Sequence, residues 1–202
     1  MQSPIGRRRF VAGALVAFAF AIAPLDPSRA ETMDPAARTI ETYYATLLPA
    51  VNAARGLSVA ERARHISPAI AGAFDIASMT RLSVGRPWSS FSESERSAMI
   101  EAFGKFLIAD YANQLSDYSG EGYTVDGNVE ARGGDQIVKT RIGATEVNYL
   151  MRGRRIVDVY ANGVVSELAA RRAEFESILA SGSGANGLIQ TLRARTQQLL
   201  GG

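Results

Sequence analysis

Between residues 34 and 117, and again after residue 163, apolar residues recur at every third or fourth position, which predicts amphipathic helices. The first helix starts at Asp34, an N-cap residue followed by proline. Ser58 and Ser92 each begin a capping box with a glutamate three positions further on, and Pro68 is expected to kink or divide the helix that contains it. Helices are therefore predicted at residues 34–55, 58–74, within 75–91, and at 92–117, 164–181 and 187–200.

After Gly120 the period changes to two, which predicts short strands at residues 123–125, 137–142, 147–151 and 156–160. Glycine-containing turns such as Asp126-Gly127 separate these segments, as in an antiparallel meander. The predicted fold class is α+β: a curved four-stranded antiparallel sheet with helices before and after it, packed on one face. A small curved sheet covered in this way can enclose an apolar cavity.

Residues 1–30 have the pattern of a bacterial secretory signal peptide. Three arginines, Arg7 to Arg9, precede the apolar run Phe10–Ala23, and small residues stand before a cleavage site after Ala30. The run of 14 residues is short for a helix that crosses a bilayer core of ~30 Å, so a retained anchor is the weaker alternative. We expect export to the periplasm, by the general secretory route or, given the paired arginines, by the twin-arginine route. A single domain, residues 31–202, would remain.

Removing this segment changes the charge of the chain. Four arginines and one aspartate are lost from 22 basic and 20 acidic residues, which leaves 18 and 19 and a net charge of −1. Nothing in this balance indicates a nucleic-acid partner. The chain has no cysteine, which excludes disulfides, thiol catalysis and thiolate metal sites.

Few residues have the spacing of a catalytic or cofactor site. His65 is the only histidine, no cluster of zinc ligands is present, and we expect no cofactor and no metal. Residues 182–187 match G-x-G-x-x-G, but a helix precedes them where the dinucleotide motif requires a strand. Asp110 and Asp117 have apolar neighbours and are typical of a solvated helix edge rather than a sugar cleft.

Several segments together resemble the MlaC family of periplasmic lipid-binding proteins, also called toluene-tolerance auxiliary proteins. These are FDIASMTRLSVGRPWSSFSESE from Phe74, FGKFLIADYANQLSDYSGEGY from Phe103, and IVDVYANGVV from Ile156. The sequence NGVVSELAARRAEF is similar to the hopanoid-associated subgroup HpnM, and it has Val165 before Ser166 where the family commonly reads Gly-Val-Ser. The lipid is therefore left open between a phospholipid and a hopanoid.

The resemblance implies an NTF2-like sheet, a hydrophobic cavity for acyl chains, and no catalysis. It also implies a monomer that carries lipid between an outer-membrane lipoprotein complex and an inner-membrane transporter, either of the Mla ABC type or of the RND type. A lipid chain exposed to water costs ~0.8 kcal/mol per CH₂, so such a carrier must cover it. The residues expected to line the cavity are Met79, Leu82, Trp88, Phe103, Phe106, Leu107, Tyr111, Val138, Val147, Tyr149, Val157 and Val159.

Two other functions are open: an NTF2-like isomerase or dehydratase with Asp158 or Asp110 as base, and an adaptor that binds only proteins. Arg152, Arg154 and Arg155 form a local basic cluster, either a solvated turn or a contact for lipid headgroups or an acidic partner.

Asp158 lies among apolar residues of the last predicted strand. Alternation places Val157 and Val159 on one face and Ile156 and Asp158 on the other, away from the cavity. Its expected partners are Arg171 or Arg172, or backbone N–H groups at the start of the helix after Gly163. We expect Asp158 and Gly163 to be structural, fixing the turn from strand to helix.

Overall fold

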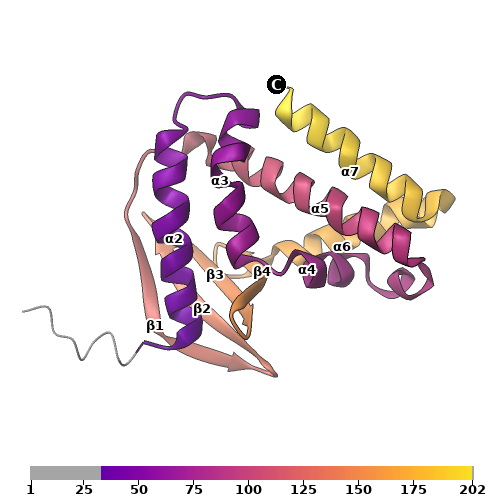
Figure 1. Ribbon diagram of the computed structural model, residues 1–202. Helices are drawn as coiled ribbons and strands as arrows, with labels where there is room; N and C mark the ends of the chain where they lie inside the picture. The colour runs from indigo at the N-terminus through magenta and orange to yellow at the C-terminus, as the bar shows by residue number, and fades with distance from the viewer. Residues whose placement is uncertain (1–32, 202) are drawn as a thin grey trace, which may run out of the picture. The chain divides into compact units, whose positions relative to one another are not determined.

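The computed structural model describes residues 33–201, which belong to one compact unit, Thr32–Gly202. The predicted signal peptide lies outside the described residues. Helices come before and after a sheet, in the order shown in Figure 1. The helices before it are α2 (Pro35–Ala53), α3 (Val59–Ala73), α4 (Ile76–Val84), the 3₁₀ turn η1 (Arg86–Ser90), α5 (Glu93–Gln114) and the 3₁₀ turn η2 (Leu115–Asp117). The helices after it are α6 (Glu167–Ile178), the π-type turn η3 (Leu179–Ser183) and α7 (Gly184–Leu200).

The predicted helix caps are present. The Asp34 carboxylate accepts a hydrogen bond from the Ala36 N–H at 2.7 Å, and both capping boxes, at Ser58 and at Ser92, are formed. The expected division of a helix at Pro68 is wrong, because α3 continues through it.

The sheet has five antiparallel strands in sequence order, one more than predicted. They are β1 (Tyr123–Arg132), β2 (Asp135–Ile142), β3 (Thr145–Arg152), β4 (Arg155–Ala161) and β5 (Val165–Ser166). The additional strand, β5, has two residues and forms because Asn162 and Gly163 adopt positive φ and turn the chain back along β4. Asp126-Gly127 was predicted as a turn but lies within β1, where the register shifts between Val125 and Val129. The shift is a bulge, which interrupts the alternation without ending the strand.

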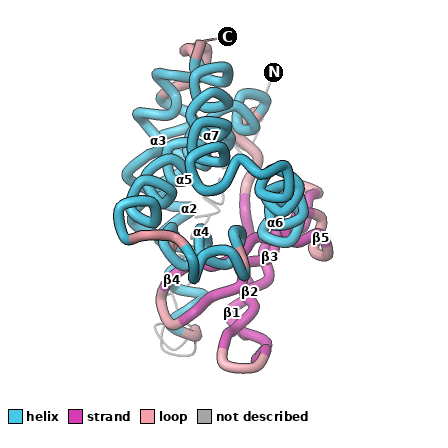
Figure 2. Tube along the Cα trace, turned by 90° about the vertical axis from the view of Figure 1, so that its right-hand side faces the viewer, coloured by secondary structure: helices cyan, strands magenta, loops and turns pink. Residues whose placement is uncertain are grey.

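The helices gather on one side of the sheet (Figure 2). Helix α2 packs on β1 and β2, and α4 and α6 pack on β4. Helix α5 lies further out, between α3 and α7. The core fills the space between the helices and the sheet and includes the fully buried Tyr44, Ile70 and Phe103. Within residues 33–201, no helix combines the length and the apolar character that crossing a membrane would need.

Candidate functional site

The residues predicted to line one cavity come in two groups, one from the sheet and one from the helices, and most of them belong to one packed core. Val138, Tyr149 and Val159 are paired neighbours on the sheet face toward the helices, and Val147 shares that face. Phe103 packs instead edge-on against Phe175 of α6, with ring centroids 6.1 Å apart. The remaining residues of the second, helical group are Met79, Leu82, Trp88, Phe106, Leu107 and Tyr111.

Most of these side chains are buried in a packed core. Only Leu82, Trp88, Tyr111 and Val147 are half-buried, and Trp88 lies in η1, where its ring contacts Phe91. The predicted internal cavity is not seen in the described part of the chain, because these side chains fill the space between helices and sheet.

The predicted orientations of Ile156 and Val157 in β4 need correction. In β3 and β4, Leu150 pairs with Asp158 but Met151 pairs with Ile156, so β4 contains one extra residue, Val157. Because paired residues share a face, Ile156 lies on the face of Val159, opposite to the face predicted from simple alternation. Val157 is buried as the extra residue of this bulge.

An aromatic cluster joins α2 to the sheet, and of its members only Tyr149 was predicted as part of the site. The Tyr43 ring lies 5.5 Å from Phe74 and 6.0 Å from Tyr149 between centroids. Tyr44 packs on Tyr149 and on Tyr123, at 5.9 and 4.8 Å. The sequence did contain a signal for this cluster, because Tyr43 and Tyr44 are adjacent on an otherwise aliphatic helix face. A buried phenol usually needs a polar partner, so two of them indicate a specific contact.

Hydroxyl groups form a short chain inside this cluster. The Tyr44 hydroxyl lies 2.8 Å from the Tyr149 hydroxyl and 2.8 Å from the Thr140 hydroxyl, which in turn donates to the Val147 carbonyl. Burial raises the pKa of Tyr43, Tyr44 and Tyr149 above the ordinary value of a phenol. These phenols therefore stay protonated at neutral pH.

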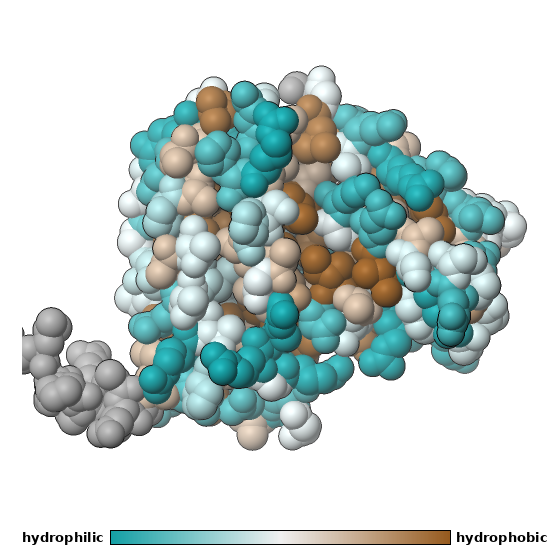
Figure 3. Space-filling view, viewed as in Figure 1, coloured by the Kyte–Doolittle hydropathy of each residue, from teal (hydrophilic) through white to brown (hydrophobic). Residues whose placement is uncertain are grey.

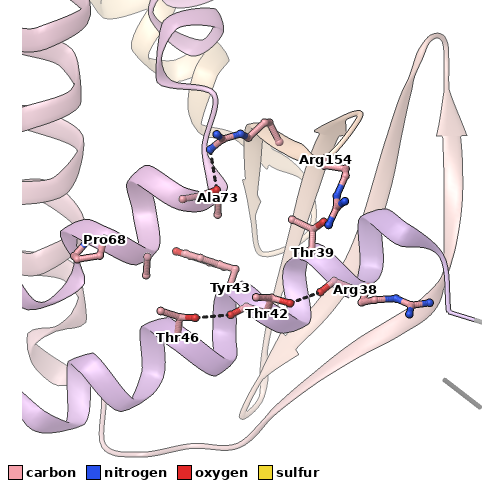
Figure 4. A pocket seen from close by; sticks show the side chains of 11 residues that line it. Arg38, Thr39, Thr42, Tyr43, Thr46, Pro68, Ala73 and Arg154 are labelled. Carbon is pink, nitrogen blue, oxygen red and sulfur yellow. Dashed lines mark hydrogen bonds between the residues drawn. The ribbon is translucent and has the colours of Figure 1, made fainter. Parts of the chain in front are cut away.

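A groove of about 400 Å³, here called the α2–α3 groove, lies above this cluster. Tyr43 forms part of its floor, and Figure 4 shows the ring lying between the threonines of α2 and Pro68 of α3. The groove is lined by Arg38, Thr39, Thr42, Tyr43, Thr46, Pro68, Ala69, Gly72, Ala73, Arg154 and Arg155. The Tyr43 hydroxyl makes no hydrogen bond to another residue in the part that the structure describes, although the side chain is only 4% exposed.

The three arginines predicted as a basic cluster have different surroundings. Arg152 forms a two-pronged pair with Asp135, at 2.8 and 2.7 Å, and does not line the groove. Arg155 lines it and donates to the carbonyls of Ala71 and Gly72, at 3.0 and 2.7 Å, at the end of α3. Arg154 lines it from the β3–β4 turn and has no ion pair or hydrogen bond within residues 33–201.

Asp158 joins β4 to the start of α6 and does not face the core. Its carboxylate accepts hydrogen bonds from the N–H groups of Val159 and Leu168, at 2.8 and 3.0 Å, and from the Ser166 hydroxyl at 2.6 Å. Of the expected partners, the backbone groups at the helix start are present. Arg171 pairs elsewhere, with Asp110 at 2.7 Å.

A cluster of charged groups lies between α5 and the start of α6. The Tyr111 hydroxyl donates to the Glu167 carboxylate at 3.1 Å, and Arg171 lies 3.9 Å from the same carboxylate and over the ring of Phe106. Burial raises the pKa of Glu167, while Arg171 and the Tyr111 hydroxyl oppose this rise. Both acids proposed as catalytic bases, Asp158 and Asp110, are thus engaged in structural contacts.

The other sequence candidates lie apart from these features. His65 is exposed, and residues 182–187 lie at the junction of α6 with α7, after a helix. Within the described residues, no three histidine or acidic side chains are placed to hold a metal ion. Figure 3 shows apolar side chains at the surface near α3 and α5, where a second groove of about 340 Å³ is lined in part by Ala63, Ile108 and Leu200.

Comparisons with known proteins agree with this architecture. The model of the MlaC protein family matches residues 42–194. The solved structure of a phospholipid-binding protein from Ralstonia solanacearum, in complex with a phospholipid, matches with a TM-score of 0.71 at 20% identity, over 81% of this chain and 98% of that one. At this identity the likeness establishes a shared fold. No curated protein matches the chain.

Proposed function

The chain belongs to the MlaC protein family, and on this premise we propose that it binds a lipid whose acyl chains enter the apolar layer between helices and sheet. The shared fold with a protein that holds a phospholipid supports this proposal. Binding, and not catalysis, is the proposed role.

The observation that carries the proposal is the contact between α2 and the sheet. This contact is made by buried aromatic and aliphatic side chains of α2, by the hydrogen bonds of Tyr44 with Tyr149 and Thr140, and by those of Asp34 with Gly127 and Gln136. Breaking four such bonds costs roughly 4 kcal/mol. Covering an acyl chain of about 14 methylenes gains roughly 11 kcal/mol, and that chain would take the place of the apolar α2 side chains on the sheet. A lipid can therefore stabilise an opened form in which α2 has moved off the sheet.

We further propose the setting in which this binding operates. The signal-peptide pattern at residues 1–30 supports export to the periplasm. There the protein would carry lipid between the membranes, with an inner-membrane lipid transporter and an outer-membrane lipoprotein complex as partners. A phospholipid is the first candidate ligand, and the likeness to the hopanoid-associated subgroup makes a hopanoid the alternative.

Native mass spectrometry tests the proposal. Protein stripped of lipid and incubated with phosphatidylglycerol vesicles should gain the mass of bound lipid, and extraction should return that lipid. Hydrogen exchange should become faster in α2 on loading, because its contacts with the sheet are broken. Wild-type protein that stays free of lipid after this incubation would contradict the proposal.

A pair of variants tests where the acyl chains lie. Val138→Phe adds volume on the sheet face toward the helices, and Leu192→Phe adds volume in α7, where the side chain is equally buried. Both overpack the core, at a cost of about 1–3 kcal/mol. Only V138F should lose lipid loading, and an equal loss in both variants would place the chains elsewhere.

A further inference from the structure

We propose that a groove on the outer side of the helices docks an acidic amphipathic helix of a protein partner. This groove, here called the α5–α7 groove, consists of two adjoining hollows of about 340 and about 230 Å³ that share Lys105 and Thr196. Its lining residues all belong to α3, α5 and α7, and none belongs to α2 or the sheet. The inference therefore goes beyond the proposed function and does not require lipid binding.

The shape of the groove suits a helix. The lining residues of α5, at positions 101, 102, 105, 108 and 109, follow one stripe of about two turns, which is roughly 12 Å long. Helix α7 contributes positions 193, 196, 197 and 200 beside this stripe, and α3 borders the half that contains Leu200. A helix laid along such a groove can insert side chains spaced three and four positions apart.

The floor of the groove is apolar and open to solvent. Ile108 and Leu200 are half-buried, and the small side chains of Ala63, Ala102 and Ala109 lie beside them. Figure 3 shows apolar side chains at the surface in this region, near α3 and α5. Apolar side chains grouped in an open hollow are typical of an interaction site. Large apolar side chains of a partner would fill the space above the alanines.

The edges of the groove are basic. Arg64, Lys105 and Arg193 are exposed, one on each of the three helices, and the only lining acid is Glu101. Lys105 pairs with Glu101 at 2.6 Å and, with a smaller effect from Arg193, lowers the pKa of that carboxyl. Arg193 itself makes no ion pair or hydrogen bond within residues 33–201. Three basic residues against one acid leave two positive charges in excess, which glutamates on a partner helix would neutralise.

Charge and shape also separate this partner from other occupants. The first 30 residues of the chain carry four arginines and one aspartate, so they would repel the edges of the groove. A second copy that docked through the same groove would bring two basic surfaces together, since α7 has two arginines and no acid. A bilayer surface is flat on this scale and would not reach the floor of the groove.

The position of the groove allows a partner and a lipid to be bound at the same time. Helix α5 lies between α3 and α7, and its other face carries the fully buried Phe103 and Leu107 of the core. A partner helix on the outer face would therefore leave the contact between α2 and the sheet uncovered. Such a partner could hold the protein while lipid enters or leaves.

The probe is a synthetic amphipathic peptide of about 18 residues, long enough to form a helix, with leucines along one face and glutamates beside them. A matched peptide has lysines in place of the glutamates. Fluorescence anisotropy should show that wild-type protein binds the glutamate peptide about tenfold more tightly than the lysine peptide. Arg193→Glu should weaken binding of the glutamate peptide about fivefold, because one attraction becomes a repulsion. Leu200→Ser should weaken it about fivefold through the loss of apolar contact.

Arg141→Glu is the matched control, because Arg141 is an exposed arginine of β2 outside the groove and its reversal should change the affinity less than about twofold. Equal affinity of wild-type protein for the two peptides, or equal losses in R193E and R141E, would overturn the inference. Displacement of the peptide when the protein is loaded with phosphatidylglycerol would place the peptide in the lipid layer and overturn it as well.

Two further outcomes separate this inference from its alternatives. Cosedimentation with phosphatidylglycerol vesicles that falls in R193E, while peptide binding does not, would assign the groove to a membrane surface and overturn the protein partner. Protein that binds the glutamate peptide as expected but loads no lipid would contradict the proposed function alone and support the docking groove.

Discussion

Asp158→Ala should destabilise the protein by removing the group that joins β4 to α6. The carboxylate is 4% exposed and accepts hydrogen bonds from the Leu168 N–H and the Ser166 hydroxyl, in addition to that of its neighbour Val159. Ser166 itself caps α6 by accepting from the Ala169 N–H at 2.9 Å. The substitution therefore leaves one N–H of the first turn without its acceptor and frees the capping serine.

The magnitude follows from the two contacts across the turn. Hydrogen bonds to a charged group contribute about 1.5–3 kcal/mol each, and the lower figure suits a helix end that water can reach after the change. The expected loss is therefore about 3 kcal/mol, which in a chain of this size lowers the melting temperature by roughly 6–12 °C. Asp158→Asn keeps one acceptor but loses the charge, so it should cost about 1 kcal/mol.

Urea denaturation followed by circular dichroism measures these differences. Asp117→Ala provides the control, because Asp117 is an exposed aspartate whose removal should change stability by less than about 0.5 kcal/mol. If D158A unfolds at the same urea concentration as D117A, the contacts at the turn do not stabilise the fold and the reasoning is refuted. If D158A melts normally but no longer loads lipid, Asp158 acts on the ligand instead.

Two further predictions concern buried polar groups. Because burial raises the pKa of Glu167, the contribution of this residue to stability should fall as pH rises from about 4 through the raised pKa. The free energy of unfolding of Glu167→Gln minus that of wild type should therefore grow over this window and then level off. Urea titrations that show a flat or falling difference would contradict this. Tyr44→Phe should cost about 1–3 kcal/mol in thermal melting, since it removes the hydroxyl that joins Tyr149 to Thr140. Tyr123→Phe is its control, with no hydroxyl bond in the described residues; equal melting of both variants would count against the role of the Tyr44 hydroxyl.

The candidate site shows where prediction from sequence was effective and where it was not. The apolar sheet residues Val138, Tyr149 and Val159 do share one face, because strand alternation is local and holds away from bulges. The predicted face of Ile156 was wrong, because one extra residue in β4 reverses the alternation of side chains. Such a bulge leaves no clear mark in the sequence. The predicted cavity was not seen among residues 33–201, since periodicity identifies buried positions without showing how their side chains fill the space between them.

The basic cluster illustrates the same limit for charge. Sequence alone makes Arg152, Arg154 and Arg155 equivalent, yet Asp135 neutralises the first and the end of α3 holds the third. Only the fold brings α3, 83 and 84 positions earlier in the chain, beside this turn. The distinction between a paired arginine and an available one is therefore a tertiary property.

The sequence by itself determined the order of helices and strands, the capped helix starts and the antiparallel meander, because periodicity, caps and glycine turns act over a few residues. Tertiary structure alone decided that the Tyr44 hydroxyl lies within hydrogen-bond distance of the Tyr149 hydroxyl, 105 positions away. The fold likewise decided that Tyr43 lines a groove together with three arginines. It also decided that Asp158 binds the first turn of α6 and not an arginine. These outcomes depend on register shifts of a single residue and on contacts between distant segments, which local patterns do not specify.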